Sequence, residues 1–145
     1  MKYLTALFIC SVLASCTSAT ILVSNSTKSL PKPIGPYSHA THHKELIFIS
    51  GQIGIDPLTN TLKTSIEEQT TQIFENLKLI LKESESDLNH IKKTTIFITD
   101  MKQFEIVNKI YRSYFTNQLP ARSTIEVVAL PNNASIEIEC IAVKK

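Results

Sequence analysis

Two segments with helical periodicity, set among short runs rich in β-branched residues, limit what this chain can fold into. Ser65-Ile66-Glu67-Glu68 is a capping box, the arrangement that starts a helix, and apolar residues then recur at helical spacing to about Glu83. Asp100 predicts the start of a second helix, with Gln103 in the N3 position. The apolar stripe of this second segment comprises Phe104, Val107, Tyr111, Tyr114 and Phe115.

The remaining regular structure is predicted to be strands. Residues 37–53 contain two short strands around a polar turn at His42 to Glu45, and residues 91–99, 122–130 and 135–143 each form one more. The resulting order is β-β-α-β-α-β-β. Two helices can cover only one face of such a sheet, so the sequence predicts an α+β fold with one sheet and both helices packed on one face.

The last predicted strand shows a regular alternation between its two faces. The residues that suit packing under the helices are Ile136, Ile138, Cys140 and Ala142. The opposite face mixes apolar and acidic side chains, namely Glu137, Glu139, Ile141 and Val143. This second face is either an interface between subunits or a solvated surface, and alternation alone does not decide between them.

Length and charge narrow the class of protein further. A chain of 145 residues forms one domain, and it can bury a sizeable core without metals or disulfides. The formal net charge is +2 and the lysines are scattered, so no nucleic-acid footprint is predicted. Cys10 and Cys16 lie in the first twenty residues, which leaves Cys140 as the one cysteine of the folded part. An internal disulfide is then excluded there.

The first nineteen residues are typical of an export signal. Lys2 precedes an apolar run from Leu4 to Ala14 that is short for a permanent membrane span. Leu13-Ala14-Ser15-Cys16 resembles a bacterial lipobox, which predicts cleavage before Cys16 and its lipidation. The alternatives are an ordinary signal peptide cut near Ala19, or an N-terminal helix that packs on the domain. Residues 20–31 are predicted to be a polar tether, and residues 32–145 the folded domain.

Arg122 is the most informative candidate for ligand binding. The chain has only two arginines, Arg112 and Arg122, among many lysines, and a guanidinium binds a carboxylate through two parallel hydrogen bonds that lysine cannot make. Glu137 and Glu139 lie on a strand predicted to run beside that of Arg122, where either could orient a water. Surface ion pairing for Arg122 and simple exposure for both glutamates are the competing interpretations.

Other polar residues give weaker indications. Tyr37 could supply an apolar wall with a hydroxyl, or be an ordinary turn aromatic. His39 and His43 face one way on a strand and His42 faces the other, with no carboxylate or cysteine at ligand spacing, so no metal site is predicted. Residues 50–54 lack a phosphate-binding motif, and no nucleophile elbow surrounds Ser50.

Taken together and in order, several segments resemble the RidA/YjgF family. The resemblance covers about residues 32–145, and its joint order is far more specific than any one motif. The segments are Ile34-Gly35-Pro36-Tyr37-Ser38, Phe48-Ile49-Ser50-Gly51-Gln52-Ile53, residues 68–78, residues 93–101, Leu119-Pro120-Ala121-Arg122-Ser123-Thr124-Ile125-Glu126-Val127, and residues 136–143.

The resemblance implies a chorismate-mutase-like fold and a homotrimer with ligand sites between subunits. It also implies deamination of 2-iminobutanoate and 2-iminopropanoate to 2-oxo acids and ammonia, without a cofactor. By position, Arg122 would hold the substrate carboxylate and Glu137 would position the attacking water. Tyr37 and Ser50 would line the pocket, and the Ser123–Thr124 backbone would complete it. Many relatives have cysteine where Thr124 stands, which argues against an obligatory thiol.

The export signal departs from the family, whose members are typically intracellular. We expect a periplasmic protein or a membrane-anchored lipoprotein, with secretion, or a cytoplasmic location if the signal is unused, as the alternatives. A trimer that binds small ligands or acts like a chaperone without turnover is the competing function. Ribonuclease activity, which the resemblance also raises, is disfavoured by the near-neutral charge.

Overall fold

The capped segment at residues 65–83 forms the longer of the two helices, as predicted. The computed structural model describes residues 30–145, so the expected signal peptide, the cleavage before Cys16 and the lipid anchor lie outside the described residues. In the capping box, Ser65 Oγ accepts a hydrogen bond from the Glu68 backbone N–H at 3.1 Å, and Glu68 Oε2 accepts one from the Ser65 N–H at 3.1 Å. These bonds satisfy N–H groups that have no partner inside the helix.

The described elements follow the predicted order, with one additional hairpin. They are β1 (Ala40–His43), β2 (Leu46–Ile53), β3 (Ile55–Asp56), β4 (Thr61–Leu62), α1 (Ile66–Glu83), the 3-10 turn η1 (Leu88–His90), β5 (Ile91–Ile98), the 3-10 turn η2 (Met101–Gln103), α2 (Phe104–Ser113), β6 (Ala121–Glu126), the 3-10 turn η3 (Pro131–Asn133) and β7 (Ile136–Val143). The two-residue strands β3 and β4 pair only with each other. The sequence predicts a turn and loop there, because strands of two residues are too short to show alternation between apolar and polar side chains.

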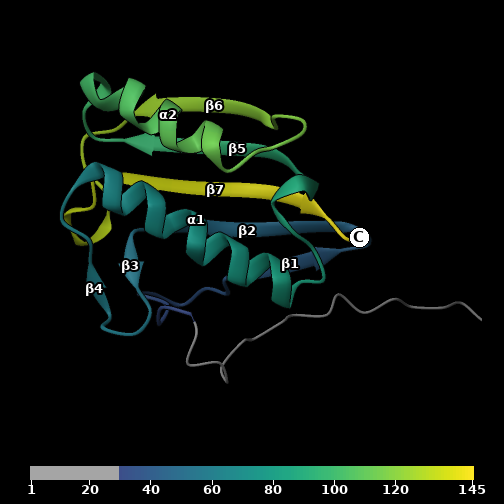
Figure 1. Ribbon diagram of the computed structural model, residues 1–145. Coiled ribbons are helices and arrows are strands. Elements are labelled where there is room, and N and C mark those ends of the chain that lie inside the picture. The colour runs from purple at the N-terminus through teal and green to yellow at the C-terminus, as the bar shows by residue number, and fades with distance from the viewer. Residues whose placement is uncertain (1–29) are drawn as a thin grey trace, which may run out of the picture.

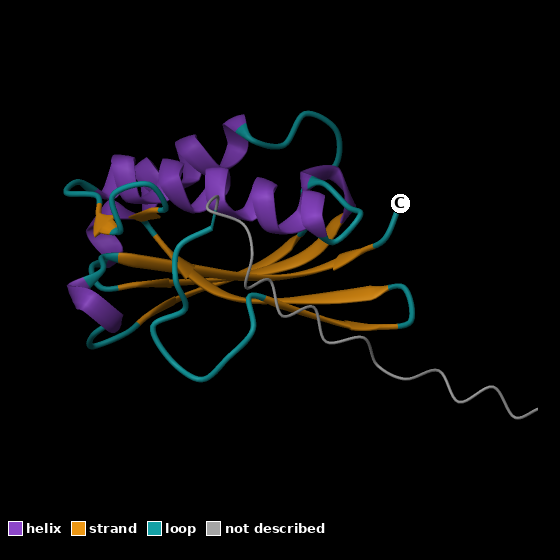
Figure 2. Cartoon of the chain, turned by 90° about the horizontal axis from the view of Figure 1, so that it is seen from below, coloured by secondary structure: helices purple, strands orange, loops and turns teal. Residues whose placement is uncertain are grey.

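Five strands form one sheet in the order β1-β2-β7-β5-β6 (Figure 1). Only β5 and β6 are parallel, because the chain returns through α2 between them. Both helices lie on one side of the sheet, and the other side carries none (Figure 2). This is the predicted chorismate-mutase-like α+β fold.

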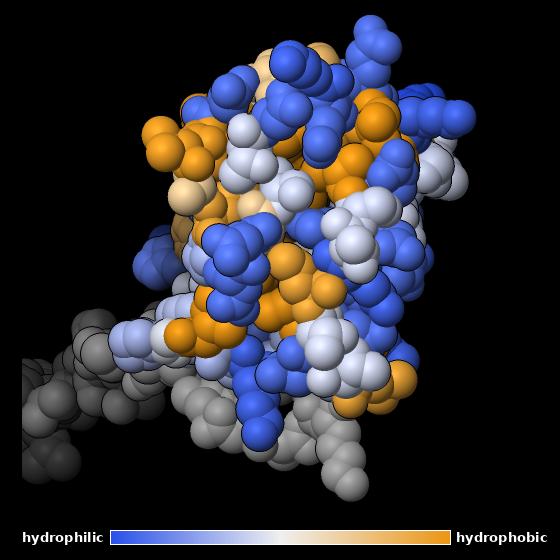
Figure 3. Space-filling model, turned by 90° about the vertical axis from the view of Figure 1, so that its left-hand side faces the viewer, coloured by the Kyte–Doolittle hydropathy of each residue, from blue (hydrophilic) through white to orange (hydrophobic). Residues whose placement is uncertain are grey.

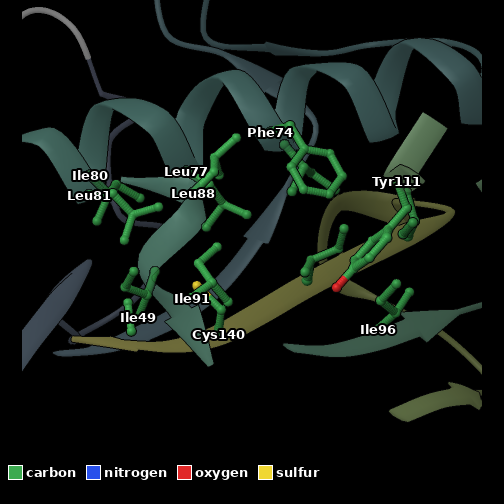
Figure 4. Packing of buried hydrophobic residues seen from close by; sticks show 14 of the residues in the cluster. Ile49, Phe74, Leu77, Ile80, Leu81, Leu88, Ile91, Ile96, Tyr111 and Cys140 are labelled. Atoms are coloured by element: carbon green, nitrogen blue, oxygen red, sulfur yellow. The ribbon is translucent and has the colours of Figure 1, made fainter. Parts of the chain in front are cut away.

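The core fills the space between the helices and the covered face of the sheet (Figure 4). Phe74 and Leu77 of α1 are fully buried, and so are Ile136 and Ile138 of β7, as the alternation predicts. Each such side chain contributes roughly 1.5–3 kcal/mol through its burial. None of the helices among residues 30–145 is both long enough and apolar enough to span a bilayer.

Two boundaries differ from the prediction. Asp100 caps η2 rather than α2, since its side chain accepts from the Lys102 N–H at 2.9 Å, and α2 itself starts at Phe104 without a side-chain cap. Strand β6 ends at Glu126 instead of continuing to Leu130. Its partner β5 ends at Ile98, whose carbonyl accepts from the Val127 N–H, so residues beyond that point have no strand to pair with.

Candidate active site

The predicted site residues fall into two groups that a single chain does not bring together. Tyr37, Ser50 and Glu137 line one pocket, whereas Arg122 and Thr124 lie on the outermost strand β6. The pocket has a volume of about 230 Å³, and we call it the Glu137 pocket. Its lining residues are Ile34, Tyr37, Ser50, Gly51, Ile53, Pro131 and Glu137.

The segment just before β1 forms one wall of the Glu137 pocket, and hydrogen bonds to the backbone hold it in place. Ser50 Oγ donates to the Ser38 carbonyl at 2.8 Å, which ties the incoming chain to β2. The Tyr37 hydroxyl accepts from the Ile34 N–H at 3.3 Å, and the Tyr37 N–H donates to the Gly35 carbonyl at 2.9 Å. Tyr37 is 42% exposed, so its ring is available to a ligand or to another subunit.

Glu137 lines this pocket from β7, where it is aligned with Ile53 of β2 and Phe97 of β5. The pairing of β2 with β7 is irregular between Ile49 and Gln52, and Gly51 in that irregular stretch lies directly against the Glu137 carboxyl group. A methyl group added at Gly51 would overlap that carboxyl. Burial, and then the nearby charge of Glu139, raise the pKa of Glu137 above its ordinary value. The carboxylate is therefore a better proton acceptor than an exposed glutamate.

Arg122 lies on the helix-covered side of β6, beneath α2. Its Cζ atom is 4.8 Å from the centre of the Tyr111 ring and 5.6 Å from that of Phe104. Within residues 30–145 the guanidinium makes neither an ion pair nor a hydrogen bond. The guanidinium thus lies over aromatic rings while its N–H donors remain available, the condition in which arginine binds a carboxylate.

Three polar atoms near Arg122 also lack hydrogen-bond partners in the described chain. Thr124 Oγ1, two residues along β6 and on the same face, is buried without one, and so are Asn108 Oδ1 and Gln103 Oε1 of the α2 region. Asn108 is not among the site residues predicted from the sequence. Its signal was available, because Asn108 lies one turn after Phe104 and one turn before Tyr111, in the middle of an aromatic stripe.

Ser123 faces the other way. Its Oγ accepts a hydrogen bond from Lys93 Nζ at 3.0 Å on the uncovered side of the sheet, so its hydroxyl is turned away from Arg122. Ser123 can serve the Arg122 group only through its backbone, which is the role the resemblance gives it. Among residues 30–145, no three His, Cys, Asp or Glu side chains are grouped as metal ligands.

The prediction that the strand of Glu137 runs beside that of Arg122 is wrong. Strand β5 lies between β7 and β6, and Arg122 is aligned with Thr94 of β5, which is aligned in turn with Cys140 of β7. Arg122 therefore shares the helix-covered face with Cys140, while Glu137 is on the opposite face. The reason is the crossover through α2, which places β6 parallel to β5 on the side away from β7.

Comparison with known proteins identifies the family of this chain. The profile of the family described as Endoribonuclease L-PSP matches residues 27–144. A RutC family protein of Buchnera aphidicola is 47% identical over 122 residues, 82% of this chain and 95% of that protein. The 2-iminobutanoate/2-iminopropanoate deaminase of Mus musculus is 44% identical over 120 residues, 82% of this chain and 89% of that protein.

A solved structure gives the same result for the fold. The crystal structure of the YjgF gene product from E. coli superposes with a TM-score of 0.78 at 36% identity, covering 83% of this chain and 97% of that one. The profile match spans most of the chain, and the relatives are similar over nearly their whole length. The chain therefore belongs to the Endoribonuclease L-PSP family, which is the RidA/YjgF family that its motifs resemble.

Proposed function

We propose that this protein hydrolyses 2-imino acids such as 2-iminobutanoate and 2-iminopropanoate to 2-oxo acids and ammonia. The observation that carries the proposal is the Arg122 guanidinium, which has no anionic partner within residues 30–145 although a planar carboxylate would suit it. The mouse relative, at 44% identity, bears the name of this activity.

The residues suggest how the reaction would proceed. Arg122 holds the substrate carboxylate and so fixes the imine carbon next to it. Glu137 takes a proton from a water molecule, whose oxygen adds to the imine carbon, and the proton passes to the nitrogen. Collapse of the resulting carbinolamine breaks the C–N bond and releases ammonia with the 2-oxo acid. Since an imine carbon is already electrophilic, positioning and one base supply the catalysis.

We further propose that the site forms between subunits of a homotrimer. Arg122 and Glu137 lie on opposite faces of the sheet of one chain, so one substrate molecule cannot contact both within that chain. A symmetric assembly can place the Arg122 group of one protomer against the Glu137 pocket of the next. Thr124 Oγ1 and the Ser123–Thr124 backbone would then complete the carboxylate site.

The test is hydrolysis of freshly generated 2-iminobutanoate. We expect wild-type protein to accelerate imine loss and Arg122→Ala to abolish the acceleration. Arg122→Lys keeps the charge but loses the second hydrogen bond; at roughly 1.5–3 kcal/mol for a charge-assisted bond, kcat/KM should fall by about one to two decades. Glu137→Gln should lower kcat more than it raises KM. Circular dichroism establishes that each variant is folded.

Subunit mixing separates a shared site from one within a chain. Arg122→Ala protein, which should be inactive alone, and Glu137→Gln protein, which should have a lowered kcat, are refolded together so that mixed trimers form. If the site lies between subunits, some sites in the mixed trimers receive an intact Arg122 and an intact Glu137, and activity returns. No recovery would contradict the shared site. Wild-type protein that binds 2-oxobutanoate but never accelerates imine loss would instead support a binding module.

A further inference from the structure

The proposed mechanism leaves open what holds the Arg122 side chain in the orientation that a carboxylate needs. An arginine on an edge strand has several rotatable bonds, and no ion pair or hydrogen bond within residues 30–145 restrains this one. Its contacts are instead the faces of two rings of α2, Phe104 and Tyr111, which together we call the aromatic shelf. Both ring centres lie within the distance at which a cation is attracted to a ring face.

We propose that Tyr111 is a positioning residue: its ring, fixed by a hydrogen bond to Thr94, holds the Arg122 guanidinium in the plane that receives the substrate carboxylate. This inference rests on the proposed function, because it gives Arg122 the same ligand. It adds a residue that would not touch the substrate and would act only through Arg122.

The first support is that Tyr111 is itself immobile. It is 3% exposed, and its hydroxyl makes a buried hydrogen bond of 2.9 Å with Thr94 Oγ1. Its ring packs edge-on against Phe74 at 5.6 Å between centres and lies 4.8 Å from the centre of Phe115. Figure 4 shows the ring reaching from α2 with its hydroxyl directed toward the sheet. Because contacts with both the sheet and the helical layer fix Tyr111, its ring can restrict the orientation of the neighbouring Arg122 side chain.

The second support is the position of Thr94. In the parallel pairing of β5 with β6, Thr94 is the residue aligned with Arg122. Three contacts therefore link Arg122, Thr94 and Tyr111 in a closed loop. Strand pairing aligns Arg122 with Thr94, a hydrogen bond joins Thr94 to Tyr111, and the guanidinium of Arg122 lies over the Tyr111 ring. Burial raises the pKa of Tyr111, so the hydroxyl stays protonated and keeps its bond to Thr94 at neutral pH.

The third support is the way the shelf uses the guanidinium. The two rings attract the guanidinium through their faces and offer it no carboxylate or carbonyl acceptor, so its N–H donors stay available for a carboxylate. The shelf can therefore restrain Arg122 without competing with the ligand. A carboxylate partner in its place would restrain Arg122 equally well but would block the site.

The experiment compares two buried aromatic residues of one cluster. Tyr111→Leu removes the ring that Arg122 contacts. We expect both KM for 2-iminobutanoate and Kd for 2-oxobutanoate to rise about tenfold, the size of effect of a partly desolvated cation–π contact. We expect kcat to change less. Phe115→Leu is the matched control, since Phe115 is 2% exposed and contacts Tyr111 but has no cation over its ring among residues 30–145. It should lower stability and leave KM unchanged.

Two more variants isolate the mechanism from general damage. Tyr111→Phe keeps the ring and loses only the hydroxyl, so it should restore most of the affinity lost in Tyr111→Leu. In an Arg122→Ala background, Tyr111→Leu should have no further effect on Kd, because the group it positions is gone. If Tyr111→Leu does not fold, Phe104→Leu at the more exposed end of the shelf should raise KM in the same way.

The outcomes distinguish this inference from the proposed function. Wild type that binds 2-oxobutanoate without hydrolysing the imine overturns the enzymatic proposal, and the Kd series still decides on the shelf. If Tyr111→Leu and Phe115→Leu both leave KM and Kd unchanged, or raise them equally, Tyr111 has no positioning role. Wild type that neither binds nor hydrolyses would overturn both.

Discussion

At the scale of single residues, the charged groups of Arg122 and Glu137 differ in their surroundings. Arg122 lies over aromatic rings, with its N–H donors available. Glu137 is half-buried, packed on Gly51, and has Glu139 two residues along the same face of β7. Desolvation and a like charge both favour the protonated acid, so the carboxylate that would serve as the base is held at a raised pKa. The surroundings of each charge match its proposed role.

This environment predicts a pH dependence. Glu137 must be ionised to accept a proton, so kcat/KM should fall as pH is lowered through its raised pKa, above the range of an ordinary glutamate. Glu139→Gln removes the like charge, which lowers the pKa of Glu137 and moves the acidic limb to lower pH. Glu67→Gln, an exposed glutamate of α1, is the control and should leave the limb in place. Overlapping profiles for wild type and Glu139→Gln would show that the charge of Glu139 does not act on the titrating base.

At the scale of elements, α1 supplies much of the core, and its first turn is closed by the capping box. Ser65→Ala removes the acceptor for the Glu68 N–H, so the free energy of unfolding should fall by about 1 kcal/mol in urea titrations at fixed protein concentration. Ser113→Ala at the other helix is the comparison: Ser113 Oγ donates to the Ile110 carbonyl at an exposed helix end, and its loss should cost less than about 0.5 kcal/mol. Equal losses would show that the box adds nothing beyond an ordinary surface hydroxyl.

The elements also show where sequence reasoning succeeds. Helix α1, the buried face of β7 and the β1–β2 hairpin follow from local periodicity and turn chemistry, and all were predicted. The order of the strands in the sheet depends on the crossover through α2. That crossover does not affect the residue periodicity of β6 or β7, so the order cannot be predicted from the periodicity. The prediction that the strands of Arg122 and Glu137 are neighbours is wrong for that reason. Asn108 was not predicted because a single amide within an aromatic stripe has no motif, and only the structure shows that its Oδ1 is buried without a hydrogen-bond partner in the described chain.

At the scale of the whole molecule, the uncovered face of the sheet exposes apolar side chains to solvent. Phe48 and Ile125 are 41% and 47% exposed there, and a hollow of about 310 Å³ lies among Phe48, Lys93, Thr95, Glu139 and Ile141. Apolar patches also lie between polar ones at one end of the molecule (Figure 3). Val128, in the loop after β6, is fully exposed. Apolar side chains on a sheet face that no helix covers are typical of an interface between subunits.

We therefore predict that the protein is a homotrimer and that the uncovered face is buried in it. Light scattering at micromolar concentration should give three times the mass of the chain. Phe48→Asp places a charge on this face, so it should yield smaller species and lose imine hydrolysis along with the shared sites. Leu58→Asp is the matched control, because Leu58 is 86% exposed in the turn between β3 and β4 and should leave mass and activity unchanged. A stable wild-type monomer with full activity would contradict both the trimer and the division of the site between subunits, since one chain holds Arg122 and Glu137 on opposite faces of its sheet.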